Sequence, residues 1–289
     1  MKINKKAAIF MALLAATLYA LNSPISKLLL NNISSTALAG LLYLGAGIGL
    51  FILRKVQKII GIQNKEIPLE KQDFPYTVAM VLLNIAASIF LLYGLSQTTA
   101  TNASLLNNFE IVATSLIAFF LFKEQISKRL WAAIFLVTLA SMILTVEDAS
   151  SFQFSYGSIF VLLACTCWGF ENNCTRKLSN KDPLQIVVVK GLGVGIGSLC
   201  IAHFIGEQLP SINYVLAALL LGFVAYGLSI SFYIYAQRSL GAAKTSTYYA
   251  VAPFIGVALS LLIFHELPSF SFWIALIIMA LGTYLASTE

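Results

Sequence analysis

The sequence is a succession of apolar stretches, each about twenty residues long, separated by short polar connections. A bilayer core about 30 Å thick requires roughly 20 helical residues to cross it, so each stretch has the length of a membrane-spanning helix. In lipid, only helices and closed barrels satisfy the polar groups of the backbone. The pattern predicts ten spans, at residues 7–27, 36–53, 74–93, 98–122, 130–146, 157–175, 184–205, 214–236, 241–264 and 269–287.

Composition agrees with this pattern. The mean hydropathy is +0.86, and only 10% of the residues are charged, compared with about 25% in soluble globular domains. No connection between spans is long enough to fold as a separate domain. We therefore expect an all-α integral membrane protein without a catalytic or nucleic-acid-binding domain outside the membrane.

The net charge of +6 follows alternate connections rather than one face of a domain, which argues against nucleic acid as a partner. With the N-terminus in the cytoplasm, the outer connections carry acidic residues, namely Glu147, Asp148, Glu207 and Glu266. The basic residues then fall almost entirely on the inner side, at Lys2, Lys5, Lys6, Arg54, Lys55, Lys58, Lys65, Lys71, Lys123, Lys128, Arg129, Arg176, Lys177, Lys181, Arg238 and Lys244. The positive-inside rule thus predicts that both termini are cytoplasmic.

The two halves of the chain resemble each other. The first span contains Leu13-Leu14-Ala15-x-Thr17-x-Tyr19-Ala20, and the sixth contains Leu162-Leu163-Ala164-x-Thr166-x-Trp168-Gly169. Each half holds five spans, an odd number, so the two copies must insert in opposite directions. This predicts two inverted five-helix repeats, at residues 1–147 and 157–289, with a binding site near mid-membrane where the repeats meet.

Short motifs at matching places in the two halves point to a family. The fourth span ends in Phe119-Phe120-Leu121-Phe122-Lys123-Glu124 and the ninth in Leu261-Leu262-Ile263-Phe264-His265-Glu266, while Trp168-Gly169 and Ala252-Pro253-Phe254 add to the pattern. Together these features resemble the EamA branch of the drug/metabolite transporter superfamily, over nearly the whole chain. The resemblance implies a ten-helix transporter of small metabolites, in the inner (cytoplasmic) membrane, with a central cavity between the repeats. It specifies no substrate.

Ionisable residues inside spans are candidate site residues, because a charge at the centre of a membrane helix costs about 2.5–3.5 kcal/mol and requires a partner or a hydrated cavity. Glu110 lies roughly 18 Å from the inner end of its span, close to the midplane. Asn107 and Asn108 precede it. Two interpretations stay open for Glu110: a cavity residue that contacts substrate or a proton, or a structural carboxyl bonded to a neighbouring helix.

Glu171 and Asn172 follow Trp168 by three and four positions, so the three residues share one helix face. In the first repeat, Asn22 follows Tyr19 by the same three positions. We expect the two helices to form a pseudo-symmetric cavity lining, each with an aromatic and a polar residue one turn apart. The alternative is that these residues only pack and hydrogen-bond between helices.

Three further features complete the candidate list. Lys190 lies roughly 12 Å into its span, at the depth of Glu171, so we expect a structural ion pair between them, with contact to substrate as the alternative for Lys190. Tyr248 could offer an aromatic face to an amine or serve only in packing. Glycines at 45, 47, 49, 191, 193, 195 and 197 predict close helix approach at the interface of the repeats.

The function that these features favour is a secondary transporter of a small organic solute, such as an amino acid, an amine or a drug-like molecule. The chain has no ATP-binding motif, so a solute or proton gradient would supply the energy, with Glu110 or Glu171 as proton carrier. A lipid-linked sugar flippase or a transporter-like helper subunit is the alternative. An enzyme is disfavoured: no HExxH or GxSxG occurs, and His203 and His265 are isolated. We expect no cofactor or metal, and homodimerisation stays open.

Overall fold

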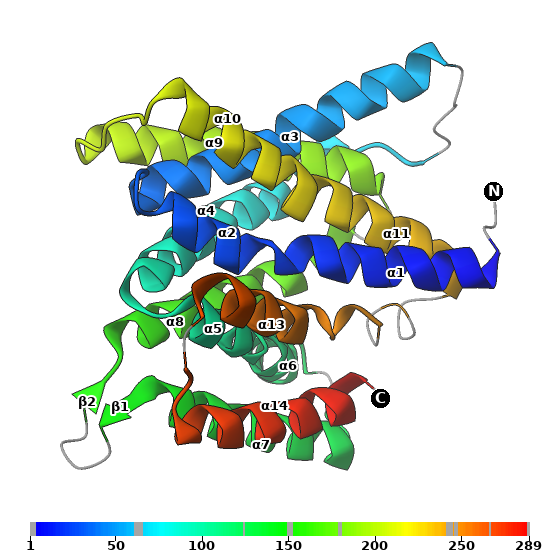
Figure 1. Cartoon of the computed structure of the whole chain (residues 1–289). Helices are drawn as coiled ribbons and strands as arrows, with labels where there is room; N and C mark the ends of the chain where they lie inside the picture. Colours follow the sequence, from blue (N-terminus) through cyan, green and yellow to red (C-terminus); the bar gives the residue numbers. More distant parts are fainter. Residues whose placement is uncertain are drawn as a thin grey trace.

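A computed structural model of the chain describes residues 4–60, 66–123, 125–148, 153–178, 181–240, 245, 248–265 and 267–287. Within these ranges the chain forms a bundle of helices (Figure 1). The first half contains α1 (Lys5–Ala20), α2 (Asn22–Leu29), α3 (Ser35–Ile59), the short η1 (Lys71–Asp73), α4 (Phe74–Gln97), α5 (Ala100–Leu106), α6 (Phe109–Phe122) and α7 (Lys128–Thr145). The second half contains α8 (Tyr156–Thr175), η2 (Arg176–Leu178), α9 (Pro183–Phe204), α10 (Ile212–Gly222), the π-helical η3 (Phe223–Leu228), α11 (Ser229–Leu240), α13 (Ala252–Phe264) and α14 (Phe270–Ser287).

Within the described residues, 8 helices are long and apolar enough to cross a membrane. Several of these spans join two consecutive elements, such as α1 with α2, α5 with α6, and α10 with α11. The helix α13 is apolar but shorter, and α8 is not among the eight. A multi-pass helical membrane protein is therefore shown, whereas the count of ten spans stays a prediction.

The outer surface of the bundle is apolar and its interior is partly polar. Large apolar side chains such as Phe10, Leu82 and Ile277 are 61–65% exposed, while Asn22 and Asn84 are buried. This distribution is the opposite of that in a soluble protein, where exposed apolar patches are small and buried amides are few. It fits a surface in contact with acyl chains.

Three predicted spans are interrupted, and in two of them proline accounts for the interruption. Pro24, just inside α2, has no N–H to donate to the carbonyl of Ala20, and α1 ends there. Pro253, at the start of α13, has no N–H for the carbonyl of Tyr249, and the chain turns at residues 250–251. The sequence analysis expected continuous helices at both places.

The third interruption divides the predicted span 98–122 into α5 and α6. Asn107 and Asn108 lie between the two helices, where the Nδ2 of Asn108 donates to the Leu105 carbonyl at 3.0 Å. Asparagine side chains compete with the backbone in this way for helical hydrogen-bond partners. Around the gap, the Sγ of Cys165 on α8 lies 3.7 Å from the Leu106 carbonyl oxygen.

The glycines bring α3 and α9 into the most extensive packing of any helix pair, as predicted. A Cβ at Gly47 would lie 2.7 Å from the backbone nitrogen of Leu192, and one at Gly191 would lie 2.6 Å from the nitrogen of Gly47. Both contacts are backbone to backbone, so any side chain would force the helices apart. On the same helix, Gly45 meets the Leu219 carbonyl of α10 with no space for a Cβ.

Charged groups fasten both ends of this helix pair. At one end, Arg54 bonds Asp182 at 2.7 Å, and Asp182 in turn caps the start of α9. At the other end, the carboxylate of Glu207 accepts from Ser34 Oγ at 2.7 Å and from the Ala37 nitrogen at 2.8 Å, which caps α3. Both contacts join the first half of the chain to the second.

The connection between α3 and α4 carries a further charged contact beside the Arg54 pair. Lys181 lies 3.1 Å from Asp73 and 3.3 Å from Glu70. Desolvation lowers the pKa of the Lys181 ammonium, but hydrogen bonds and Coulombic attraction to these two carboxylates outweigh it, so the pKa lies above its ordinary value. The loop before α4 is thereby held against the start of the second repeat's α9.

One element differs from the all-helical expectation. The strands β1 (Val146–Asp148) and β2 (Gln153–Phe154) pair in antiparallel fashion between the two halves, with Val146 opposite Phe154. In a connection outside the apolar stretches, two short strands can pair so that their backbone N–H and C=O groups hydrogen-bond to each other. Glu124 and Glu266, which carry part of the sequence motif, lie outside the described residues.

The glycine contacts generate a stability prediction. Gly47→Ala should cost at least about 1–3 kcal/mol, because its methyl group meets backbone that cannot move aside. The thermal midpoint of the purified protein should fall by about 2–4 °C per kcal/mol. Gly193→Ala is the matched control, since its Cβ would meet only the side chain of Val81, at 3.0 Å. Equal midpoints for the two variants would contradict the account.

Candidate functional site

The three interruptions converge inside the bundle. A Cβ on Gly256, in the second turn of α13, would lie 3.0 Å from Ser104 Oγ on α5 and 3.4 Å from the Ala20 carbonyl oxygen at the end of α1. Three helices from both halves of the chain therefore meet at their interrupted ends. Such ends present carbonyl and N–H groups that are not used within the helix.

Glu110 lies in the first turn of α6, directly after one interruption. Its Oε1 accepts a hydrogen bond of 2.6 Å from Asn172 Nδ2 on α8, and Asn172 also reaches Thr114 Oγ1 at 3.2 Å. Glu110 and Asn172 are only half-buried. The structure thus brings together two residues that the sequence analysis named on separate helices, and leaves part of their surface accessible.

Glu171, one position before Asn172, is held differently. Its side chain is 2% exposed, and its Oε1 lies 3.1 Å from Lys190 Nζ on α9. Thr175, one turn later on α8, donates a hydrogen bond to the same carboxylate. The carboxylate of Glu171 is thus neutralised by the ammonium group of Lys190. The sequence analysis expected this pair because the two residues lie at the same depth.

Trp168 connects this polar group to the first half of the chain. Its Nε1 donates to Asn84 Oδ1 on α4 at 3.2 Å, and the hydroxyl of Tyr43 on α3 donates to the same oxygen at 3.0 Å. Asn84 is fully buried and bonds the Met80 carbonyl through its Nδ2 at 2.9 Å. One buried amide therefore links three helices.

Beyond Tyr43 the network becomes aromatic. The Tyr43 ring stacks on Tyr226, with centroids 5.0 Å apart, and Tyr226 meets Tyr19 edge-on at 6.0 Å. Tyr19 contacts Tyr249 at 5.8 Å, and Tyr249 contacts Tyr233 at 5.1 Å. We call these five residues the tyrosine row. Tyr249, rather than its neighbour Tyr248, supplies the ring next to Tyr19.

Two predicted site residues place side-chain amides at the interruptions. Asn22 is 1% exposed; its Oδ1 accepts from Ser26 Oγ at 3.1 Å, and its side chain hydrogen-bonds that of Tyr226. Among the described residues, Asn107 Oδ1, between α5 and α6, has no hydrogen-bond partner. A buried polar atom without a partner is costly, and a bound ligand or water can satisfy it.

The expected arrangement of two facing lining helices differs from the one observed. α1 packs mainly on α11 and α13, whereas α8 packs mainly on α4 and α6. Tyr19 and Trp168 are instead linked through Tyr226, Tyr43 and Asn84. The sequence analysis did not name these three connecting residues. The signal available for each was a polar group, an amide or a hydroxyl, within a long apolar stretch.

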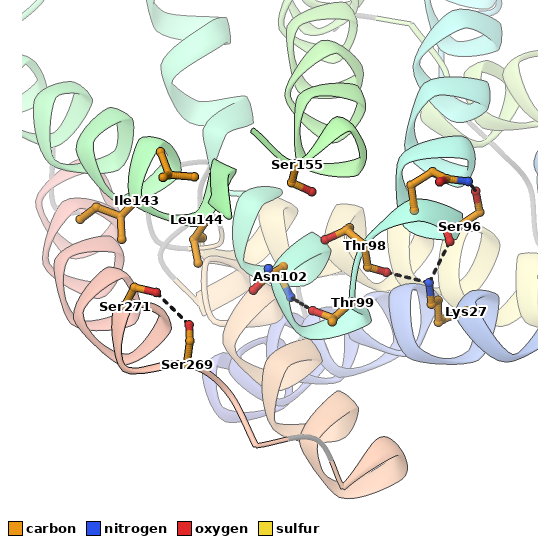
Figure 2. A pocket seen from close by; sticks show the side chains of 12 residues that line it. Lys27, Ser96, Thr98, Thr99, Asn102, Ile143, Leu144, Ser155, Ser269 and Ser271 are labelled. Atoms are coloured by element: carbon orange, nitrogen blue, oxygen red, sulfur yellow. Dashed lines mark hydrogen bonds between the residues drawn. The ribbon is translucent and has the colours of Figure 1, made fainter. Parts of the chain in front are cut away.

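A pocket of about 470 Å³ opens elsewhere, near the β1–β2 hairpin. Figure 2 shows that hydroxyl and amide groups surround it, among them Thr99, Asn102, Ser155 and Ser269. Lys27 lies at its edge, with its ammonium bonded to the Leu95 and Thr98 carbonyls and to that of Ser96, at 2.6, 2.7 and 3.2 Å. None of the predicted site residues lines this pocket.

Comparison with known proteins decides the family. The model of the EamA-like transporter family matches the chain twice, over residues 6–146 and 155–288. The chain belongs to the EamA-like transporter family. An uncharacterized transporter of Methanothermobacter thermautotrophicus (strain Delta H) is 25% identical over 96% of this chain and 85% of its own length. A solved crystal structure that is 15% identical has a TM-score of 0.68 over 98% of both chains, which supports the fold.

Membership of the EamA-like family confirms the resemblance seen in the sequence and identifies a multi-pass membrane protein of a transporter family. It favours transport over catalysis. In this EamA-like transporter, the matched halves are joined by the β1–β2 hairpin and meet at the network described above.

The pairing of Glu171 and Lys190 generates a prediction for this EamA-like protein. Lys190→Met leaves a buried carboxylate without its cation, so it should cost about 3–5 kcal/mol of stability, and Glu171→Gln should act similarly. The double variant should recover part of the loss because no charge is left unpaired. Yield and thermal midpoint of the purified protein measure the effect.

The control for the pair is Glu70→Gln. Glu70 is half exposed, and Lys181 keeps its contact with Asp73 at 3.1 Å in that variant. An exposed pair contributes at most about 1 kcal/mol. If both single variants at positions 171 and 190 behave like Glu70→Gln, the buried pair is not structural.

Proposed function

We propose that the chain is a secondary transporter that carries a small organic metabolite across the cytoplasmic membrane by alternating access. The observation that carries the proposal is the convergence of three interrupted helices on a polar and aromatic network inside the bundle. Discontinuous helices at the interface of repeats form the substrate sites of many secondary transporters. Backbone groups released at such interruptions can bind a polar solute in the middle of the membrane.

The packing supports two inverted five-helix repeats, at residues 1–147 and 157–289. The first repeat then has five spans, namely α1–α2, α3, α4, α5–α6 and α7. In the same order, their counterparts in the second repeat are α8, α9, α10–α11, the span ending in α13, and α14. The pair α1 and α11 then corresponds to the pair α8 and α4, and both pairs are in contact. The pairs α3–α9 and α7–α14 each join a span to its own counterpart.

The burial of the polar residues favours a carrier over a lipid-linked sugar flippase. A flippase requires a polar groove that opens sideways to lipid. Asn22 and Glu171 are 1% and 2% exposed, whereas Glu110 and Asn172 keep accessible surface next to the tyrosine row. The pocket near the β1–β2 hairpin is then the outer mouth of the pathway, since Asn102 in its wall and Asn107 at the interruption lie on the same span.

Glu110 is the candidate carrier of a coupling proton. Its carboxylate accepts a hydrogen bond from a neutral amide, whereas Glu171 is paired with Lys190. The titratable and charged groups near Glu110 come from several elements: Glu171 and Cys165 on α8, Lys190 on α9, Tyr19 on α1, Tyr43 on α3, and Tyr249.

The proposed topology places both termini in the cytoplasm. Figure 1 shows the start of α1 and the end of α14 at one end of the bundle and the β1–β2 hairpin at the other. A green fluorescent protein fused to either terminus should fluoresce, because it folds only in the cytoplasm, while alkaline phosphatase at either terminus should be inactive. Opposite results at the two ends would overturn the inverted repeat.

Counterflow tests the transport mechanism. Solutes that raise the thermal midpoint of the purified protein in a metabolite screen are loaded into proteoliposomes, and uptake of the labelled solute is measured. Alternating access predicts that preloading accelerates uptake, whereas a channel would show no acceleration.

The same vesicles test the role of Glu110. Uptake should vary with pH in the wild type, and Glu110→Gln should abolish this variation because glutamine cannot bind or release a proton. Glu70→Gln, on the exposed inner loop, should leave the profile unchanged. A pH profile that survives in Glu110→Gln would assign the proton to another group, and uptake independent of pH in the wild type would exclude proton coupling.

A further inference from the structure

We propose that the site recognises a small organic cation, whose ammonium group lies between the Glu110 carboxylate and the rings of Tyr19 and Tyr249. This inference rests on the transport function proposed above and names the chemical class of its solute. It is carried by the tyrosine row and by the balance of charge around it.

The rings of the tyrosine row differ in burial. Tyr43 and Tyr226 are 6% and 4% exposed and stack on each other. Tyr19 and Tyr249 are only partly buried, with their rings tilted by 43° to one another. Aromatic faces arranged in this way bind ammonium groups by cation–π attraction, most strongly where water is excluded.

The π-helical turn η3 places Tyr226 in this row. A π turn inserts one extra residue into a helix and is frequent at functional sites. Tyr226 lies within η3 and contacts Tyr19 of the first repeat and Tyr43 of a second helix. The π turn therefore places the ring of Tyr226 in the row, in contact with the partly buried Tyr19.

The balance of charge leaves one carboxylate for a ligand. Among the described residues of the network, Glu171 and Lys190 neutralise each other at 3.1 Å, and Glu110 adds one further negative group. Glu110 lies within electrostatic range of Tyr19 and of Tyr249. An ammonium group at these rings would thus be attracted by the carboxylate as well, and a solute anion would be repelled.

Asn22 positions one ring of the row. It is 1% exposed and hydrogen-bonds the side chain of Tyr226. The carbonyl end of α1, at Ala20, adds partial negative charge to the same region.

Binding of two cations and their neutral isosteres tests the inference. Choline is paired with dimethylbutanol, and tyramine with propylphenol, so each pair differs in charge and not in shape. Isothermal titration calorimetry on the full-length protein in detergent should show binding of at least one cation, at least tenfold tighter than its isostere. Equal affinity within both pairs, or no binding of either cation, would overturn the proposal.

Variants then separate the carboxylate from the rings. Glu110→Gln keeps the acceptor for Asn172 but removes the charge, and should weaken cation binding at least tenfold. Tyr249→Phe retains the ring and should bind within about threefold of the wild type, whereas Tyr249→Leu should lose at least tenfold. Tyr156→Leu, at a residue 78% exposed, is the matched control and should bind normally. Unchanged affinity in both Glu110→Gln and Tyr249→Leu would contradict the proposed site.

The outcome is independent of the transport test. Counterflow of a neutral or anionic solute without cation binding would support the transport proposal and refute the cation site. Failure of every solute to show counterflow would refute the transport proposal, whatever choline and tyramine do.

Discussion

In hydrocarbon, no water is present to bond a backbone N–H or C=O, so a helix can be interrupted only where other protein groups cover the gap. The interruptions at Leu21 and at Asn107–Asn108 obey this constraint, because Asn22 and Asn108 are at most 3% exposed. At residues 250–251, Val251 is 36% exposed and the following Ala252 is 1% exposed. Covering the gaps brings three helices together from both halves of the chain. The polar interior of the bundle is therefore a consequence of how these interruptions are satisfied.

The rest of the bundle is built for rigidity. α3 and α9 approach backbone to backbone at Gly47 and Gly191, and charged contacts at Asp182 and Glu207 fasten their two ends. A close-packed pair with fixed ends resists sliding. Interrupted helices have fewer internal backbone hydrogen bonds at their ends, so relative motion concentrates there. Substrate access in the proposed mechanism thus depends on the interrupted helices moving against the α3–α9 pair.

Helix positions are predictable from the sequence because lipid sets the length of each apolar stretch. The described helices overlap these stretches, although α3 continues to Ile59 and α4 to Gln97. The contact between Glu171 and Lys190 follows from depth alone, since 1.5 Å per residue places both at one level and a buried charge needs a counter-charge. The interruptions do not follow in the same way. Pro24 and Pro253 are compatible with a continuous kinked helix, and only the neighbouring helices decide whether the backbone opens.

The tyrosine row lies beyond sequence reasoning for a geometric reason. Arguments from helical spacing assume 3.6 residues per turn, about 100° per residue. The π turn at Phe223–Leu228 inserts one residue, which rotates every later side chain on that helix by roughly this angle. Helix-face arithmetic therefore assigns Tyr226 and Tyr233 to the wrong faces relative to each other. Charges can be paired by depth along the membrane normal, but aromatic contacts require the rotation of each helix, and only the structure supplies it.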